Sequence, residues 1–265
     1  MTNQPARPFV RNFPTMVAET DRIEPAPRRV RGNLNGRTIF DTTRAQYVWE
    51  WPNYPQYYVP FEDVTQHFLF DEGRPQKLHL GTAARHGLRV GDVQQDAAAW
   101  VYGRDAHPGI VGTVRFEWGA LDAWFEEDEE IFVHPRNPYT RVDAVRSHRA
   151  VRVELDGVVL AETRSPVMLF ETGLPTRYYV DKTDVRFEHL EPSATRTSCP
   201  YKGTTTNYWS VQANGQLHQD LAWSYDLPTV AVGAVAGLVA FYDEKVDVFL
   251  DGVAMARPVT HFFSD

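Results

Sequence analysis

The sequence lacks the features of several common protein classes. It contains one cysteine, Cys199, in 265 residues, which excludes an intramolecular disulfide and is usual in reducing compartments. The net charge is −8 and no basic stripe is present, which disfavours a nucleic-acid partner because phosphates need clustered lysine and arginine. The longest apolar run, at 230–242, is too short and glycine-rich to cross a bilayer. We therefore expect a soluble, cytoplasmic protein with neither a nucleic-acid nor a membrane partner.

Sequence motifs for well-known chemistry are also absent. The chain has no G-x-x-x-x-G-K-[ST], G-x-G-x-x-G, G-x-S-x-G or H-E-x-x-H pattern, so phosphate loops, serine hydrolysis and zinc proteolysis gain no support. An acidic run at 126–130 could bind a divalent cation, but such runs are more often a solvated face or end of a helix. We predict no metal site.

The main positive feature is an internal duplication. The string E-T-G-L-P-T-R-Y-Y-V at 171–180 repeats E-W-P-N-Y-P-Q-Y-Y-V at 50–59, and this offset of 121 extends over 36 ungapped positions with eleven identities. The offset then rises to 125, at which Gly112, Val114, Phe116 and Asp122 match Gly237, Val239, Phe241 and Asp247. A period this long indicates tandem domains rather than a solenoid.

The duplication predicts three parts of the chain. Residues 1–28 are rich in proline and are expected to form an extended arm across the first module. The first, divergent module covers 29–138 and the second covers 139–265, and the segment 129–149 is predicted to connect them because it has no counterpart in the repeat.

Local patterns predict a mainly β fold made of small antiparallel sheets with few short helices. Asn35-Gly36 and Asp156-Gly157 lie inside alternating segments and predict hairpins with type I′ turns, which need positive φ at both central residues. Later segments are short, aromatic or β-branched, and interrupted by proline or glycine. Helices are predicted only at 119–129 and near 229–235.

Several strings carry a resemblance to a known family. The segment from Ser147, S-H-R-A-V-R-V-E-L-D-G-V-V-L-A-E-T, is followed by T-S-C-P-Y-K-G, N-Y-W-S-V, L-A-W-S-Y and V-A-F-Y-D-E-K-V-D-V-F-L-D-G. Together they closely resemble the bacterial and fungal family catalogued as domain of unknown function 427, in a tandem two-domain form.

The resemblance implies a β-tent-like fold in each module, similar to the ligand-binding domain of cereblon and to methionine sulfoxide reductase B. Several relatives with that fold hold a four-cysteine zinc, which one cysteine cannot supply, so no zinc is expected and the cofactor is left unknown. The family also carries a nucleotidyltransferase label, which the motifs of this chain do not support.

Candidate site residues come from a comparison of the two copies. Where the second module reads C-P-Y-K-G at 199–203, the first reads K-L-H-L-G at 77–81, and Arg177 is replaced by Gln56. The leading hypothesis is an anionic small molecule bound in an aromatic cavity of the second module, with Lys202 and Arg177 as charge partners. The candidate ligand-binding residues are Arg177, Tyr178, Tyr179, Tyr201, Lys202, Trp209, Trp223 and Tyr225.

Other interpretations remain open. An enzyme could use Lys202 or Cys199 as acid, base or nucleophile at the same place, although a surface lysine and a buried, inert cysteine are the commoner cases. A purely structural or protein-interaction role is the third hypothesis. Glu171, which repeats Glu50, is expected to pair with a basic residue inside its module, because an unpaired buried carboxylate is costly.

Strand alternation sorts the aromatic candidates. Tyr178 and Tyr179 are adjacent and must point to opposite sides, so one should be core and the other could line a cavity. Trp223 and Tyr225 share one face, and with Trp209 they could form an aromatic wall or simply fill the core.

Overall fold

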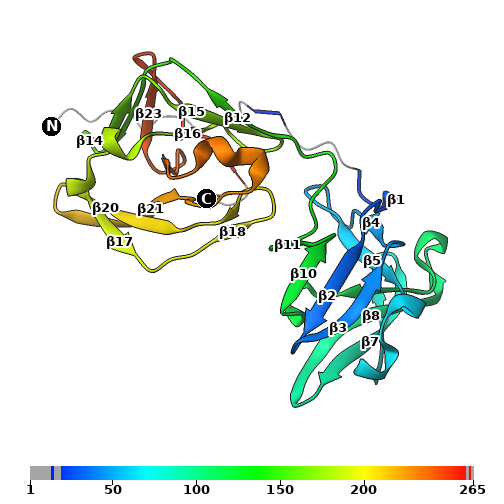
Figure 1. Ribbon diagram of the computed structural model, residues 1–265. Helices are drawn as coiled ribbons and strands as arrows, with labels where there is room; N and C mark the ends of the chain where they lie inside the picture. Colours follow the sequence, from blue (N-terminus) through cyan, green and yellow to red (C-terminus); the bar gives the residue numbers. More distant parts are fainter. Residues whose placement is uncertain (1–12, 15–18, 261–262, 264–265) are drawn as a thin grey trace. The chain divides into compact units, whose positions relative to one another are not determined.

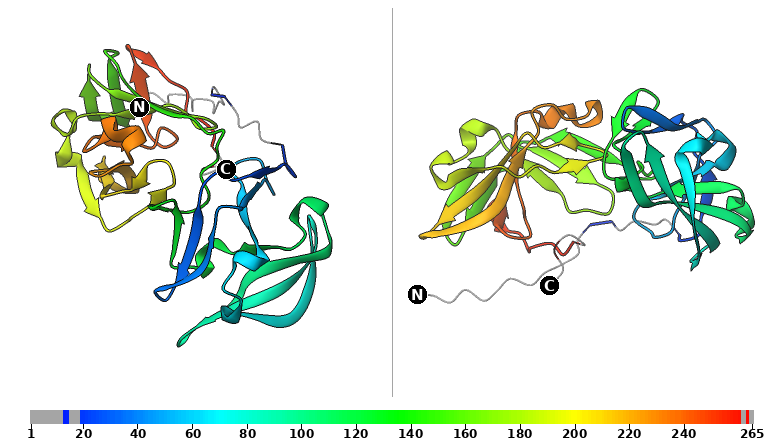
Figure 2. Two further views of the ribbon diagram at one scale, coloured as in Figure 1. Left: turned by 45° about the vertical axis from the view of Figure 1, so that its right-hand side comes forward. Right: turned by 90° about the horizontal axis from the view of Figure 1, so that it is seen from below.

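The computed structural model describes residues 13–14, 19–260 and 263, whose contacts divide into two compact units (Figure 1). The first module ends at Tyr139, and the second begins at Thr140 and includes Phe13 and Pro14. Each unit consists of short antiparallel strands joined by turns and 3-10 segments, as the further views in Figure 2 also show. The predicted mainly β architecture is confirmed.

The first module contains a seven-stranded sheet of order β1-β4-β5-β9-β8-β7-β6 and a four-stranded sheet of order β11-β10-β2-β3. The strands are β1 (Ile23–Pro25), β2 (Val30–Leu34), β3 (Arg37–Thr42), β4 (Gln46–Val48), β5 (Gln56–Pro60), β6 (Leu69–Leu78), β7 (Gly81–Val90), β8 (Val93–Ala106), β9 (Thr113–Phe116), β10 (Ala123–Glu126) and β11 (Glu129–Ile131). The 3-10 segments are η1 (Phe61–Asp63), η2 (Gln66–Phe68), η3 (Pro108–Ile110) and η4 (Trp118–Ala120).

The second module uses smaller sheets, of orders β12-β15-β16, β14-β13-β23-β24, β17-β20-β21-β22 and β18-β19. The strands are β12 (Val142–Arg146), β13 (Val151–Leu155), β14 (Val158–Thr163), β15 (Val167–Glu171), β16 (Arg177–Tyr179), β17 (Leu190–Ser193), β18 (Ser198–Cys199), β19 (Gly203–Thr204), β20 (Asn207–Ala213), β21 (Gln216–Ser224), β22 (Val239–Phe241), β23 (Asp247–Leu250) and β24 (Val253–Ala254). The 3-10 segments are η5 (Lys182–Asp184), η6 (Phe187–His189) and η7 (Val230–Val235), the last drawn in orange in Figure 1.

Both predicted hairpins are present. Asn35 and Gly36 have φ of 49° and 68°, and Asp156 and Gly157 have φ of 51° and 81°. These are the positive values that a type I′ turn requires. The turns join β2 to β3 and β13 to β14, and the inward residues of these strands lie in the core of each module.

The helix predicted at 119–129 is wrong. Only η4 is helical there, and β10 and β11 form a hairpin that turns at Glu127, whose φ is 52°. β10 pairs with β2 on its other side, so its backbone hydrogen bonds and its buried Trp124 and Glu126 outweigh the helix propensity of an alanine- and glutamate-rich string. The short helical piece predicted near 229–235 is confirmed as η7.

The connection predicted at 129–149 is also shorter than expected. The segment contains β11 and β12. Strand β12 pairs with β15 in the same way that β1 pairs with β4, so β12 is the counterpart of β1 in the repeat. The predicted arm falls largely on residues 1–12 and 15–18, outside the described residues, and its described end enters β1.

Strand register refines the repeat near its end. Val30 lies opposite Glu126, whereas the equivalent Val151 lies opposite Leu250. The true offset on β10 and β23 is therefore 124, and the match of the two aspartates made at 125 is wrong by one residue. Leu250 consequently occupies the position of Glu126, and Val248 that of Trp124.

Candidate functional site

One group of the predicted residues forms a buried aromatic cluster between β16, β20 and β21. Tyr179, Trp223 and Tyr225 belong to it, together with Tyr208, which lies directly opposite Trp223. The indole Nε1 of Trp223 donates to the Tyr179 hydroxyl at 3.3 Å. Burial raises the pKa of Tyr179 to about 12, so its hydroxyl stays protonated at neutral pH.

Trp209 lies on the other face of β20. It packs in a second cluster with Phe187 edge-on to its ring, because alternation along the strand sends Tyr208 and Trp209 to opposite sides. The place expected for Trp209 beside Trp223 is therefore taken by Tyr208.

Lys202 lies in the turn between β18 and β19 and is largely buried. Its ammonium donates to the carboxylate of Glu171 at the end of β15. Burial alone would disfavour the ammonium, but the neighbouring Cys199 and Glu171 outweigh it and raise the pKa of Lys202 well above its usual value. This shift is opposite to the one that a lysine nucleophile needs.

The first module confirms the expectation that the repeated glutamate pairs with a cation. Glu50 contacts Arg115 of β9, with 3.3 Å between Nε and Oε1. The register places Ala240 of β22 where Arg115 stands, and Leu80 aligns with Lys202. The repeated carboxylate is thus neutralised from two different places, from β9 in the first copy and from the turn between β18 and β19 in the second.

Arg177 on β16 also has internal partners. Its two terminal nitrogens donate to Glu244 at 2.7 and 2.5 Å, and Nη1 lies 3.7 Å from the Asp243 carboxylate. Its guanidinium also lies over the rings of Trp223 and Tyr242, at 5.9 and 5.7 Å from their centroids. The charges that were expected to hold an anion are therefore both balanced by carboxylates of the module.

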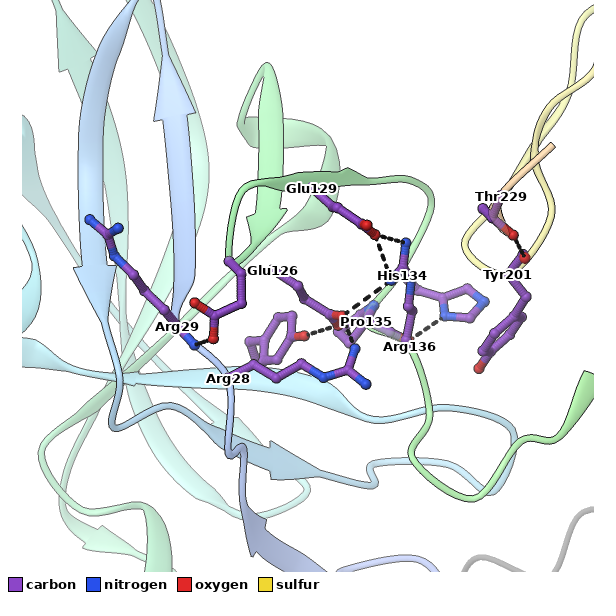
Figure 3. Close-up of polar contacts among 11 residues, drawn as sticks. Arg28, Arg29, Glu126, Glu129, His134, Pro135, Arg136, Tyr201 and Thr229 are labelled. Atoms are coloured by element: carbon purple, nitrogen blue, oxygen red, sulfur yellow. Dashed lines mark hydrogen bonds and ion pairs between the residues drawn. The ribbon is translucent and has the colours of Figure 1, made fainter. Parts of the chain in front are cut away.

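Cys199 and Tyr201 flank this region. Cys199 is a half-buried free thiol at the end of β18. The carbonyl of Tyr201 accepts a hydrogen bond from the Thr229 hydroxyl at 2.5 Å, which ties the C-P-Y-K-G turn to the residue that precedes η7 (Figure 3).

A cavity of about 450 Å³ lies on the opposite side of β16 from the aromatic cluster. Tyr178 points into it while Tyr179 is buried in the cluster, as alternation predicts. Its lining residues are Phe13, Val145, Arg146, Ser147, Arg149, Met168, Phe170, Pro175, Thr176, Tyr178, Asp243, Val246, Val248, Leu250, Met255, Ala256 and Pro258. The Tyr178 hydroxyl makes no hydrogen bond with any described residue, and burial raises its pKa to about 12.

The equivalent place in the first module is filled by larger side chains. Tyr57, the counterpart of Tyr178, stacks on Tyr47 and Trp124 at 5.5 and 6.2 Å between ring centroids. Its hydroxyl donates to Glu126 at 2.5 Å, and Arg28 pairs with the same carboxylate (Figure 3).

The second module carries smaller or apolar residues at each of these three positions. Strand register puts Met168 at the position of Tyr47, Val248 at that of Trp124 and Leu250 at that of Glu126. All three line the cavity. The two modules share the backbone arrangement at this place, and the cavity is present in the second module because its side chains there are smaller or apolar.

The match to a family model agrees with the duplicated architecture. The model described as Domain of unknown function (DUF427) matches residues 22–127 and again residues 143–252. The chain belongs to the DUF427 family. No curated protein matches it significantly.

Metal-binding clusters and membrane-spanning helices are both absent from the described residues of this DUF427 chain. Within residues 13–14, 19–260 and 263, no group of three or more histidine, cysteine, aspartate or glutamate side chains is placed to hold a metal ion. Among those same residues, no helix has the length and apolar character needed to span a bilayer. Glu126, in the acidic run, is instead buried against Arg28 and Tyr57.

Sequence reasoning missed Asp243, which is the buried charged residue of this DUF427 cavity, and Arg146 and Arg149, which are exposed residues of its lining. Asp243 lies in the string F-Y-D-E-K, where an adjacent acidic pair looks like a surface turn. The aligned first-module string F-E-W-G-A has no aspartate at this position. The comparison of the two copies that singles out Lys202 and Arg177 therefore also singles out Asp243.

Proposed function

We propose that the second module binds a small organic molecule in the cavity beneath Tyr178, and that the first module is its structural partner. The main support is the contrast between the two copies. The two modules share the same strand arrangement here. In the first module Tyr47, Trp124 and Glu126 occupy the space next to Tyr57. In the second module the equivalent Met168, Val248 and Leu250 line a cavity.

The size and lining of the cavity also fit a ligand. Its volume of about 450 Å³ lies within the range of small-molecule pockets, roughly 300–1,000 Å³. Most of its lining residues are apolar, among them Met168, Phe170 and Val248, and its buried polar side chains are those of Tyr178 and Asp243. The other polar residues of the lining are at least partly exposed: Arg146, Ser147, Arg149 and Thr176. Apolar walls with few placed polar groups are typical of such pockets. Tyr178 is the one candidate from the sequence that this proposal retains as a direct contact.

The test fills the cavity with the residue that the first module already uses. Val248→Trp places an indole where Trp124 stands. The matched control is Val253→Trp on β24, where the valine is 65% exposed and does not line the cavity. Freshly purified wild type and both variants are compared by native mass spectrometry, with small molecules then released and identified under denaturing conditions.

The proposal predicts a bound mass, or uptake of a metabolite-extract component, in wild type and in Val253→Trp but not in Val248→Trp. Hydrogen exchange of β13, β15 and β23 checks that Val248→Trp is folded. Equal occupancy in the folded Val248→Trp variant would overturn the proposal, as would the absence of any cavity-dependent binding from all three proteins.

A further inference from the structure

Asp243 is a buried carboxylate on the wall of the cavity that lacks a close counter-ion. The residue lines the cavity and is 7% exposed. The neighbouring guanidinium of Arg177 donates both of its short hydrogen bonds to Glu244, whose carboxylate also accepts from Thr260 at 3.1 Å. Asp243 is left 3.7 Å from Nη1 of Arg177, beyond hydrogen-bond distance. One guanidinium therefore faces two carboxylates, and a buried negative charge remains in excess.

Two arginines near the rim of the cavity have carboxylate partners of their own. Arg149 is exposed and pairs with Asp251, with 2.7 Å between Nε and Oδ2. Arg257 pairs with Asp247, with 3.5 Å between Nη2 and Oδ1. Neither guanidinium is in contact with Asp243.

Two further cations near the cavity point elsewhere. Lys245 is exposed, and its ammonium lies 4.5 Å from the ring centroid of Phe263. Arg146 is also exposed, and it lies opposite Val167, which in turn lies opposite Tyr179. Paired residues share one face of a sheet, so the Arg146 side chain lies on the face of the aromatic cluster. The excess charge at Asp243 is therefore not balanced by the side chains that the structure describes.

Tyr178 supplies a second polar group beside Asp243. Burial, followed by the charge of the Asp243 carboxylate, raises the pKa of Tyr178 to about 12, so its hydroxyl stays protonated at neutral pH. The hydroxyl oxygen makes no hydrogen bond with any described residue and can accept one from a ligand. The lining residues of β23 and of 255–258 are all apolar. The cavity thus combines hydrogen-bond acceptors at one place with an apolar surface at another.

We propose that the cavity takes a small organic amine whose ammonium group is held by the Asp243 carboxylate and the Tyr178 hydroxyl oxygen, while its apolar body lies against β23. This inference rests on the proposed function. An ammonium group has three donors and no acceptor, so it matches two acceptors that lack donors, and its charge balances the excess carboxylate. The expected ligand is a cation rather than the anion predicted from the sequence, because Lys202 and Arg177 are already paired with carboxylates.

Binding of the amine is coupled to a proton. Burial raises the pKa of Asp243 to about 7, with Arg177 opposing the shift and Glu244 adding to it. A proton therefore balances the excess charge in part of the unliganded molecules at neutral pH. The ammonium needs the ionised carboxylate, so the amine displaces this proton and binds more tightly as the pH rises.

The test compares three probes of one shape: the cationic 4-phenylbutylamine, the neutral 4-phenylbutyramide and the anionic 4-phenylbutyrate. The amine and the acid each keep their charge between pH 6 and pH 8. Dissociation constants are measured by ligand-observed NMR at both pH values and constant ionic strength, with wild type, Val248→Trp, Asp243→Asn and Asp156→Asn. Asparagine keeps the shape of Asp243 without its charge. Asp156→Asn is the matched control, because it removes an exposed aspartate outside the cavity and introduces the residue type that the first module has at Asn35.

We expect wild type to bind the amine more tightly than the amide, and the amide more tightly than the carboxylate. The affinity for the amine should rise about tenfold from pH 6 to pH 8, because the ionised fraction of a group with a pKa of about 7 rises by the same factor over that range. Asp243→Asn should bind the amine no more tightly than the amide and show no such rise, whereas Asp156→Asn should behave as wild type. Hydrogen exchange of β22 and β23 checks that Asp243→Asn is folded.

Tighter binding of the carboxylate than of the amine, pH-independent binding of the amine to wild type, or unchanged amine binding in the folded Asp243→Asn variant would each overturn this inference while leaving the proposed function intact. An equal loss of amine binding in Asp156→Asn would do the same. Failure of all three probes to distinguish wild type from Val248→Trp is a different result. It would count against the cavity as a ligand site and would refute the proposed function with the inference.

Discussion

The buried ion pair of Lys202 and Glu171 leads to a quantitative prediction. Lys202→Leu introduces the residue that the first module carries at this position, Leu80. The Glu171 side chain, which is 6% exposed, then loses its counter-ion. Removing one partner of a buried pair costs about 3–5 kcal/mol because the other charge is left uncompensated.

The cost is limited by an alternative, which is protonation of Glu171. At pH 7 this costs about 1.4 kcal/mol for each pH unit above the ordinary glutamate pKa of about 4.3, or about 4 kcal/mol. The folded variant would bind this proton more tightly than the unfolded chain, so its stability falls as the pH rises above about 4.3. We expect a loss of about 3–4 kcal/mol at pH 7 and only about 1 kcal/mol at pH 5.

The first module also provides a rescue. It neutralises Glu50 with Arg115 from β9, and the equivalent residue of β22 is Ala240. Adding Ala240→Arg to Lys202→Leu supplies a cation from the strand that the other copy uses. We expect the double variant to recover about 2 kcal/mol at pH 7.

Hydrogen exchange of the full-length protein, read by mass spectrometry, reports on each module separately. Peptides covering β15 and β16 should lose protection in Lys202→Leu, while peptides of the first module stay unchanged. The matched control, Arg115→Leu, should affect only first-module peptides. A loss below about 1 kcal/mol at pH 7, or one that does not vary between pH 5 and pH 7, would refute the reasoning.

Two further predictions concern single side chains. The pKa of Asp243 in the folded module is raised to about 7, so above about pH 4 the folded module binds more protons than the unfolded chain. Wild type should therefore lose stability relative to Asp243→Asn as the pH rises from 4 to 7, by at most about 4 kcal/mol. Parallel pH profiles of the two proteins in urea denaturation would contradict this. Gly81→Ala should cost more than Gly203→Ala. Both glycines have positive φ, 128° and 95°, but a Cβ at Gly81 would lie 2.4 Å from the Cα of Ala106, whereas the nearest atom at Gly203 is 3.6 Å away. We expect about 1–2 kcal/mol for Gly203→Ala and more for Gly81→Ala in the same assay, and equal costs would contradict the steric argument.

The sequence predicts which face several site residues occupy and that a carboxylate is paired, but it does not predict which residue is the partner. Alternation at Tyr178-Tyr179 correctly predicts that the two rings lie on opposite faces of the strand, and repetition of glutamate at 50 and 171 correctly predicts a paired carboxylate. The sequence does not reveal that Lys202 is the partner of Glu171, because the two residues come from different sheets and are 31 positions apart.

The sequence by itself determined the duplication, the type I′ hairpins and the mainly β class, since these depend on neighbouring residues and on the two-residue period of a strand. The tertiary structure alone decided that most of 119–129, predicted as a helix, belongs to the β10–β11 hairpin. It also decided that Arg177 and Lys202 are neutralised internally and that a cavity lies beside Tyr178. A cavity is the volume left by side chains from several strands, and a buried charge is set by whichever groups surround it. Neither quantity is a property of any one segment of the chain.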